Sequence, residues 1–94
     1  MVGDAMAAKR TWQDVMDELL KLKKRKADGT AWRWDVAVKD KALDGLRVIP
    51  LLETRAEHFL RTMERGKVSA NIYLRRIHNF AVGMNWLPSQ IIPP

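Results

Sequence analysis

The clearest helical pattern in the chain is TWQDVMDELLKLKKRK, which runs from Thr11 to Lys26. Thr11 can cap this helix, and Asp14 three residues later completes an approximate capping box. Acidic residues come early and basic residues late, as the helix dipole favours, and Asp28-Gly29 ends the helix. Gln13 and the charged residues fall on one side, and the apolar residues recur at helical spacing on the other: Trp12, Val15, Met16, Leu19, Leu20 and Leu22.

The next segment, Thr30–Leu43, fits two readings. Its first half alternates like a strand, whereas the whole segment also reads as a helix capped by Thr30. We favour the helix, because no other segment offers a strand to pair with and a lone strand leaves its backbone unpaired. A helix here is expected to lie wedged between neighbouring elements, because it carries two apolar stripes. One stripe is Trp34, Val38 and Ala42, and the other is Trp32, Val36 and Leu43.

The middle of the chain predicts a connector and a third helix. Asp44–Glu53 contains Gly45 and Pro50 and reads as a connector, with core contacts expected from Leu46, Val48, Ile49, Leu51 and Leu52. The run Thr54-Arg55-Ala56-Glu57 is a well-formed capping box that predicts the start of a helix reaching about Arg65, which Gly66 ends. The expected apolar face of this helix is Ala56, Phe59, Leu60 and Met63.

The last predicted helix is capped by Ser69 and runs to about Asn85, with Pro88 ending the helical region and Pro93-Pro94 extended. Its expected apolar face is Tyr73, Leu74, Ile77, Phe80, Ala81 and Met84. Four helices with short connections and no internal repeat predict an all-α fold, a compact four-helix bundle.

Composition limits the class of protein. The chain has 94 residues, enough for one core, which we divide into a flexible leader over 1–10 and a domain over 11–94. It has no cysteine and two histidines, so no metal site and no cofactor is expected. No apolar run approaches the roughly 20 residues of a membrane span, and a cytoplasmic location without a membrane partner is expected. The net charge of +6 and a pI near 10.1 predict a polyanionic partner.

The last helix carries the main candidate site. At helical spacing, Asn71, Arg75, His78 and Asn79 fall away from its apolar face, Arg76 flanks them, and Lys67 and Ser69 stand at the helix entry. Arginine suits guanine, asparagine suits adenine, and a helix N-terminus suits a phosphate. The alternative is an ordinary solvated face, which spacing alone favours because most helices have one.

Other residues are more ambiguous or have ordinary roles. The basic run Lys21–Lys26 either contacts phosphates or complements the helix dipole. The second segment offers three further candidate phosphate contacts: Arg33, Lys39 and Lys41. They become stronger candidates only if that segment lies beside the last helix. We expect the tryptophans and Tyr73 in the core and both histidines, His58 and His78, on the surface. No catalytic triad, phosphate-binding glycine loop or pair of carboxylates is present.

Three pieces of the last third resemble one family: Gly66-Lys67-Val68-Ser69-Ala70-Asn71, Tyr73-Leu74-Arg75-Arg76-Ile77-His78-Asn79-Phe80-Ala81-Val82 and Asn85-Trp86-Leu87-Pro88. They look like the final helix of the core-binding domain of tyrosine recombinases, the phage integrases. Trp12–Lys26 resembles that domain's first helix, and Gly45 with Leu52-Glu53-Thr54 resembles the approach to its third. The resemblance extends over Thr11–Pro94.

The resemblance implies a SAM-like, four-helix domain that holds duplex DNA at a recombination site during DNA integration. The family's catalytic residues lie in a separate later domain and Tyr73 does not match the nucleophile, so the chain is not expected to be an enzyme. The isolated domain is expected to be a monomer, and its parent an oligomer on DNA. Helices two and four would face DNA through Lys67, Ser69, Asn71, Arg75, Arg76 and Asn79, and secondarily through Arg33, Lys39 and Lys41. A helical protein–protein module anchored by tryptophans and a helix-turn-helix regulator remain alternatives.

Overall fold

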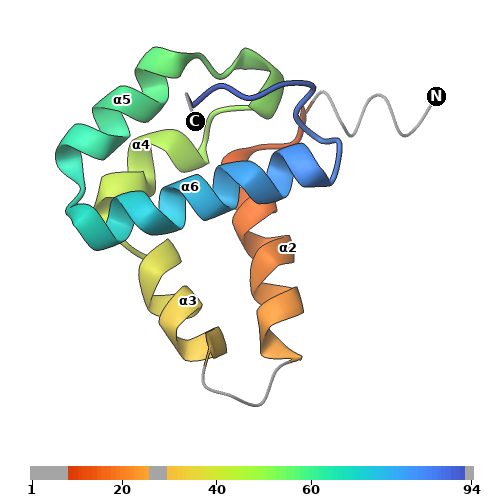
Figure 1. Ribbon diagram of the computed structural model, residues 1–94, viewed down its shortest axis with the longest axis vertical. Helices are drawn as coiled ribbons and strands as arrows, with labels where there is room; N and C mark the ends of the chain where they lie inside the picture. Colours follow the sequence, from red (N-terminus) through yellow and green to blue (C-terminus); the bar gives the residue numbers. More distant parts are fainter. Residues whose placement is uncertain (1–8, 26–29, 93–94) are drawn as a thin grey trace.

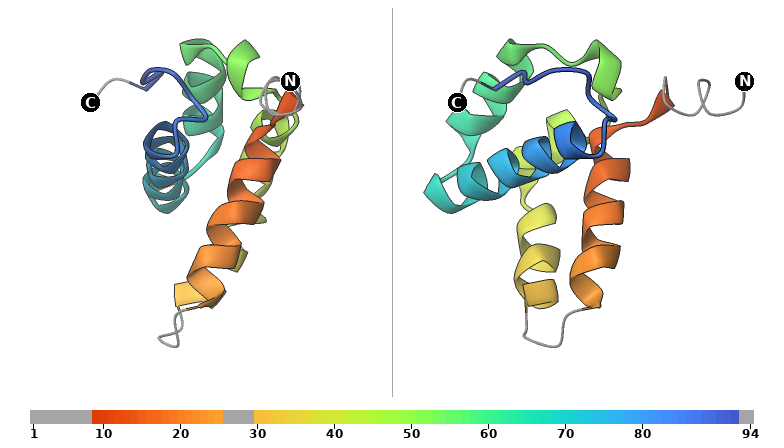
Figure 2. Two further views of the ribbon diagram at one scale, coloured as in Figure 1. Left: turned by 90° about the vertical axis from the view of Figure 1, so that its right-hand side faces the viewer. Right: turned by 45° about the vertical axis from the view of Figure 1, so that its right-hand side comes forward.

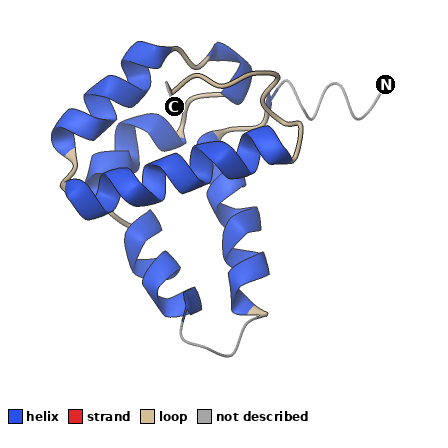
Figure 3. Cartoon of the chain, viewed as in Figure 1, coloured by secondary structure: helices blue, strands red, loops and turns tan. Residues whose placement is uncertain are grey.

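A computed structural model describes residues 9–25 and 30–92. These residues form five α-helices and no strand: α2 (Trp12–Lys24), α3 (Thr30–Val38), α4 (Asp44–Arg47), α5 (Ala56–Arg65) and α6 (Val68–Gly83). Two short 3-10 turns, Lys41–Leu43 and Leu51–Glu53, complete the described elements, and Figure 3 shows helices joined by loops throughout. The all-α prediction is confirmed. The expectations for residues 1–8, for Lys26 and Asp28-Gly29, and for Pro93-Pro94 fall outside the described residues.

The arrangement of the helices places α3 beside α6. In Figure 1, α2 and α3 lie side by side and α6 crosses in front of their upper ends, with α5 above it. The left view of Figure 2 shows α6 at one side of the α2–α3 pair. The contacts agree, because α2 packs on both α3 and α6, and α3 also packs on α6. The one-turn α4 lies in the segment where the sequence predicts a connector.

Trp12 stands at the centre of the core and is completely buried. Its ring meets the Phe59 ring edge-on, with 5.0 Å between centroids. The indole Nε1–H donates to Thr54 Oγ1 over 2.7 Å, and the Thr54 hydroxyl donates to the Pro50 carbonyl over 2.8 Å. Burying the indole is therefore possible because its one polar atom has a partner.

The start of α5 differs from the sequence prediction because Thr54 serves Trp12 instead of capping a helix. The N-cap residue is Arg55, and its backbone N–H donates to Nδ1 of His58 over 2.9 Å. The end of α5 at Arg65, with Gly66 as the C-cap, is as predicted. By contrast, the capping box of Thr11 and Asp14 at the start of α2 is confirmed.

Several predicted apolar faces are wrong at their edges. Leu22, Val48, Leu52, Ala56, Leu60 and Met84 are exposed. In α5 the buried side is centred on Phe59 and Thr62, because the Thr62 hydroxyl donates to the His58 carbonyl over 2.9 Å and so tolerates burial. The second apolar stripe predicted for Thr30–Leu43 is only partly buried: Trp32 and Val36 are exposed, whereas Leu43 is buried, like Trp34 and Val38 of the first stripe. The helix ends at Val38, before the predicted Leu43, which lies in the following 3-10 turn.

Both ends of α6 also differ from the prediction. The N-cap is Lys67, without a side-chain capping bond, and Ser69 lies inside the first turn because the helix begins two residues earlier than predicted. The helix ends at Gly83, two residues before the expected Asn85. Asn85 adopts a φ of 61°, a left-handed conformation that asparagine tolerates, and this turns the chain back over α6.

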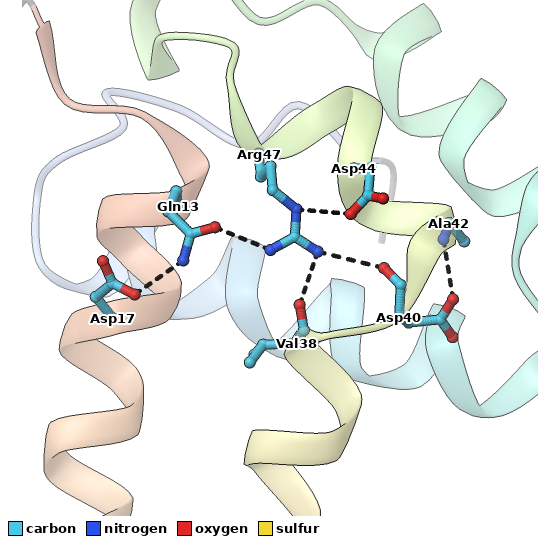
Figure 4. A network of polar contacts seen from close by, with 7 residues as sticks. All are labelled: Gln13, Asp17, Val38, Asp40, Ala42, Asp44 and Arg47. Atoms are coloured by element: carbon cyan, nitrogen blue, oxygen red, sulfur yellow. Dashed lines mark hydrogen bonds and ion pairs between the residues drawn. The ribbon is translucent and has the colours of Figure 1, made fainter.

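A polar network around Arg47 fixes α2, α3 and α4 to one another (Figure 4). Its guanidinium donates to Gln13 Oε1 over 2.9 Å and to the carbonyls of Val38 and Asp40 over 2.8 and 3.3 Å. Its Nε lies 3.0 Å from a carboxylate oxygen of Asp44. Gln13, expected on the solvent side, is half-buried because it takes part in this network.

Candidate nucleic-acid interface

The outer side of α6 carries a stripe of exposed side chains at helical spacing, which we call the α6 ridge: Val68, Ile72, Arg75, Arg76 and Asn79. The opposite side of the helix is anchored in the core by Leu74, Ile77 and Ala81. The outward orientation of Arg75 and Asn79, predicted from spacing, is therefore confirmed. Tyr73 and Phe80 are half-buried between the two sides.

The α6 ridge carries positive charge without nearby compensation. No Asp or Glu follows Glu64 in the sequence, whereas Arg65, Lys67, Arg75 and Arg76 do. Every ion pair that the described residues form lies elsewhere: Lys21 with Glu18, Lys39 with Asp35, and Arg47 with Asp44. Within the part of the chain that the structure describes, no ion pair therefore offsets the charge of Lys67, Arg75 or Arg76.

Aromatic contacts hold one of these cations and connect α6 to α3. The Arg76 guanidinium carbon lies 5.8 Å from the centroid of the Tyr73 ring. That ring in turn meets Trp34 of α3 edge-on, with centroids 4.7 Å apart. Tyr73 thus serves as packing, as expected, and positions Arg76 along the helix.

The α3 helix lies beside α6, and this is the arrangement that makes Arg33, Lys39 and Lys41 stronger candidates. A shallow cavity of about 270 Å³ opens between them, and we call it the α3–α6 hollow. Arg33 from α3 and Ser69 from α6 both line it. Its complete lining is Trp32, Arg33, Val36, Ala37, Asp40, Ser69, Ala70 and Tyr73.

The other two predicted lysines are less available or more distant. Lys39 Nζ lies 3.0 Å from a carboxylate oxygen of Asp35, which offsets its charge. Lys41 is exposed on the 3-10 turn after α3. Asp40, at the edge of the hollow, is engaged locally because its Oδ1 accepts the backbone N–H of Ala42 over 2.9 Å.

Asn71 has a different environment from the rest of the predicted set. It is half-buried, and its side-chain amide donates to the Met63 carbonyl over 3.3 Å. A Cβ built on Gly66 would come within 3.2 Å of Asn71 Oδ1. Asn71 thus fastens the end of α5 to the start of α6.

His78 is buried, and the expectation of a surface histidine is wrong. Its Nε2 accepts the backbone N–H groups of Ile91 and Ile92 over 2.9 and 3.4 Å. The proton therefore sits on Nδ1, which faces Oδ1 of Asn79 at 3.1 Å. This leaves the amide donors of Asn79 to the solvent side.

Burial lowers the pKa of His78 below its ordinary 6.5, and the hydrogen bond with Asn79 opposes that shift. The sequence could not indicate this environment, because it depends on a segment that returns from thirteen residues away.

Two features of the surface were not predicted. Trp12 and Trp34 are buried as expected and Trp86 is half-buried, but Trp32 is 71% exposed. A second cationic hollow of about 220 Å³ lies between α4 and α5, where Arg61, Arg65 and His58 share a wall opposite Gly45. The only sequence signal for the latter is the one-turn spacing of the two arginines.

Among the described residues, no cluster of three metal-ligating side chains occurs, and no helix is both long and apolar enough to span a bilayer. Comparisons of the chain with protein-family models, with curated proteins and with solved structures found no match.

Proposed function

We propose that this chain is the DNA-binding module of a phage-type integrase, a site-specific tyrosine recombinase, and that it holds duplex DNA at the recombination site. The observation that carries the proposal is the α6 ridge, where Arg75, Arg76 and Asn79 stand exposed on a helix without a carboxylate. An α-helix with its side chains is about 10–12 Å wide, which matches a major groove about 12 Å wide.

The side chains divide into two roles in this proposal. Arg75, Arg76 and Asn79 lie along the ridge and face base edges, where arginine pairs with guanine and asparagine with adenine. Lys67 and Ser69 at the start of α6, together with Arg33 across the α3–α6 hollow, contact phosphates on the groove wall. Lys39 and Lys41 contribute less, because Lys39 is paired with Asp35 and Lys41 lies beyond α3. Asn71 acts by holding the helix start.

The module does not cleave DNA by itself in this proposal. It belongs to the SAM-like, four-helix core-binding type and binds as a monomer in the cytoplasm. Strand cleavage and exchange are performed by a separate catalytic domain of the parent protein, which assembles as an oligomer on DNA.

The test is binding of a fluorescent duplex followed by anisotropy over a series of salt concentrations. Each neutralised phosphate contributes about −0.9 to the slope of log affinity against log salt, so several contacts give a slope steeper than about −2. Affinity that does not change with salt would contradict the proposal.

A protein–protein module is the second candidate, and one observation favours it. Trp32 is 71% exposed and Val36 beside it is 53% exposed, and exposed aromatic groups often anchor partners. NMR shift mapping with duplex DNA separates the two functions. Shifts at Arg75, Arg76 and Lys67 support the DNA-binding module, whereas the lack of any shift on adding duplex DNA favours a protein partner docked at Trp32.

A further inference from the structure

The amino-terminal half of the α6 ridge is apolar although it faces solvent. Val68 is 77% exposed and Ile72 is 47% exposed. They are four residues apart, so their side chains are neighbours on the helix surface. Lys67 precedes them and Arg75 and Arg76 follow, so a ligand of this surface must offer both negative charge and apolar groups.

Duplex DNA offers that combination at one chemical group. In the major groove, between two rows of phosphates, the C5-methyl group of thymine is the apolar feature of the base edges. We propose that Val68 and Ile72 contact thymine methyl groups, so that the part of the site under the start of α6 contains thymine. This inference rests on the proposed DNA-binding function and specifies the bases that it prefers.

The layout of the ridge suits this assignment. The distance from Val68 to Asn79 along the helix axis is about 16 Å, at 1.5 Å per residue. One end of the ridge thus carries the methyl-contacting side chains and the other end carries Arg75, Arg76 and Asn79, which bond to base edges. The absence of carboxylates on α6 favours DNA over a protein partner of mixed charge.

The experiment compares two probes, an alternating dA–dT duplex of about twenty base pairs and the same duplex with deoxyuridine in place of thymidine. Deoxyuridine lacks only the methyl group. We expect binding to weaken about fourfold for each methyl group contacted, the factor that corresponds to one buried methyl. A second pair, an alternating dG–dC duplex with and without methyl groups at cytosine C5, restores a methyl at the equivalent position and is expected to show a gain.

Two variants assign the effect to residues. Val68→Ser and Ile72→Ser each remove exposed apolar atoms and leave the core untouched, and both are expected to reduce the ratio of dA–dT to dA–dU affinity toward one. Val48→Ser is the matched control, since Val48 is 70% exposed at the end of α4 and is not part of the α6 ridge. It is expected to keep the wild-type ratio.

The outcomes separate this inference from the proposed function. Salt-dependent binding with equal affinity for the two duplexes would overturn the inference and leave the DNA-binding function intact. A ratio of dA–dT to dA–dU affinity that stays at the wild-type value in Val68→Ser and Ile72→Ser would also overturn it. Unchanged binding of every duplex by these variants would do the same, and it is the result expected if the ridge docks a protein. Failure of the wild-type chain to bind either duplex would remove both proposals.

Discussion

His78 Nε2 accepts the backbone N–H of Ile91 over 2.9 Å. This bond joins the middle of α6 to the segment that follows it, and it holds Ile92 among the buried core residues. The imidazole packs against both Trp12 and Phe59, with ring centroids 6.5 and 5.5 Å away. One buried histidine thus ties the segment after α6 to the core.

The first prediction concerns pH. Because burial lowers the pKa of His78 in the folded chain below 6.5, the unfolded chain binds more protons as pH falls. The contribution of His78 to the free energy of unfolding is therefore complete above pH 6.5 and declines as pH falls below it, through the lowered pKa. Urea unfolding measured between about pH 8 and pH 5 checks this.

The control for this prediction is removal of the imidazole. His78→Gln is expected to lower stability and to flatten the pH dependence between about pH 7 and pH 5. Equal slopes for wild type and His78→Gln would show that another group is responsible.

The second prediction concerns Arg75. Arg75→Ala is expected to weaken binding to a duplex selected from random sequences by about 1–3 kcal/mol and to affect random duplexes less, if Arg75 reads a base. Arg55→Ala, an exposed arginine at the start of α5, serves as the control for lost charge. Equal losses on selected and random duplexes would assign Arg75 to the phosphate backbone instead.

The third prediction concerns Arg47. Its guanidinium satisfies carbonyl groups after α3 and the Gln13 side chain of α2, so Arg47→Ala leaves several of these acceptors without partners. We expect a loss of about 2–4 kcal/mol in the free energy of unfolding, and a smaller loss in Arg47→Lys. Arg55→Ala is expected to change stability by less than about 0.5 kcal/mol. Similar values for Arg47→Ala and Arg55→Ala would contradict the role of the network.

The fourth prediction compares two glycines. A Cβ at Gly66 would lie 3.1 Å from the Cβ of Ala70 and 3.2 Å from Asn71 Oδ1, whereas a Cβ at Gly83 meets no atom within 4 Å. Gly66→Ala is therefore expected to destabilise the chain by about 1–2 kcal/mol through overpacking. Gly83→Ala, at the end of α6, is expected to stabilise it by about 0.5–1 kcal/mol. Thermal melting checks both, and a stabilising Gly66→Ala would show that the α5–α6 corner relaxes freely.

The sequence predicted features that depend on neighbouring residues. The capping box of Thr11 and Asp14, the end of α5 at Gly66 and the outward orientation of Arg75 and Asn79 all follow from spacing within one helix. Such short-range signals do not depend on how the helices pack.

The features that the sequence did not predict depend on distant partners. Thr54 has the local pattern of a cap but bonds to Trp12, 42 residues away. His78 has the spacing of a surface residue but is covered by the returning chain, and Trp32 has the apolar character of a core residue but remains 71% exposed. Helical periodicity gives the direction of a side chain and does not give what lies in that direction.

The concentration of all carboxylates before residue 65 has a kinetic consequence. A molecule whose last helix carries Arg75 and Arg76 and no carboxylate experiences a torque in the field of a polyanion. It would rotate during diffusion until α6 leads, so fewer encounters would be wasted on wrong orientations. Added salt would then slow association through lost orientation as well as through weaker contact.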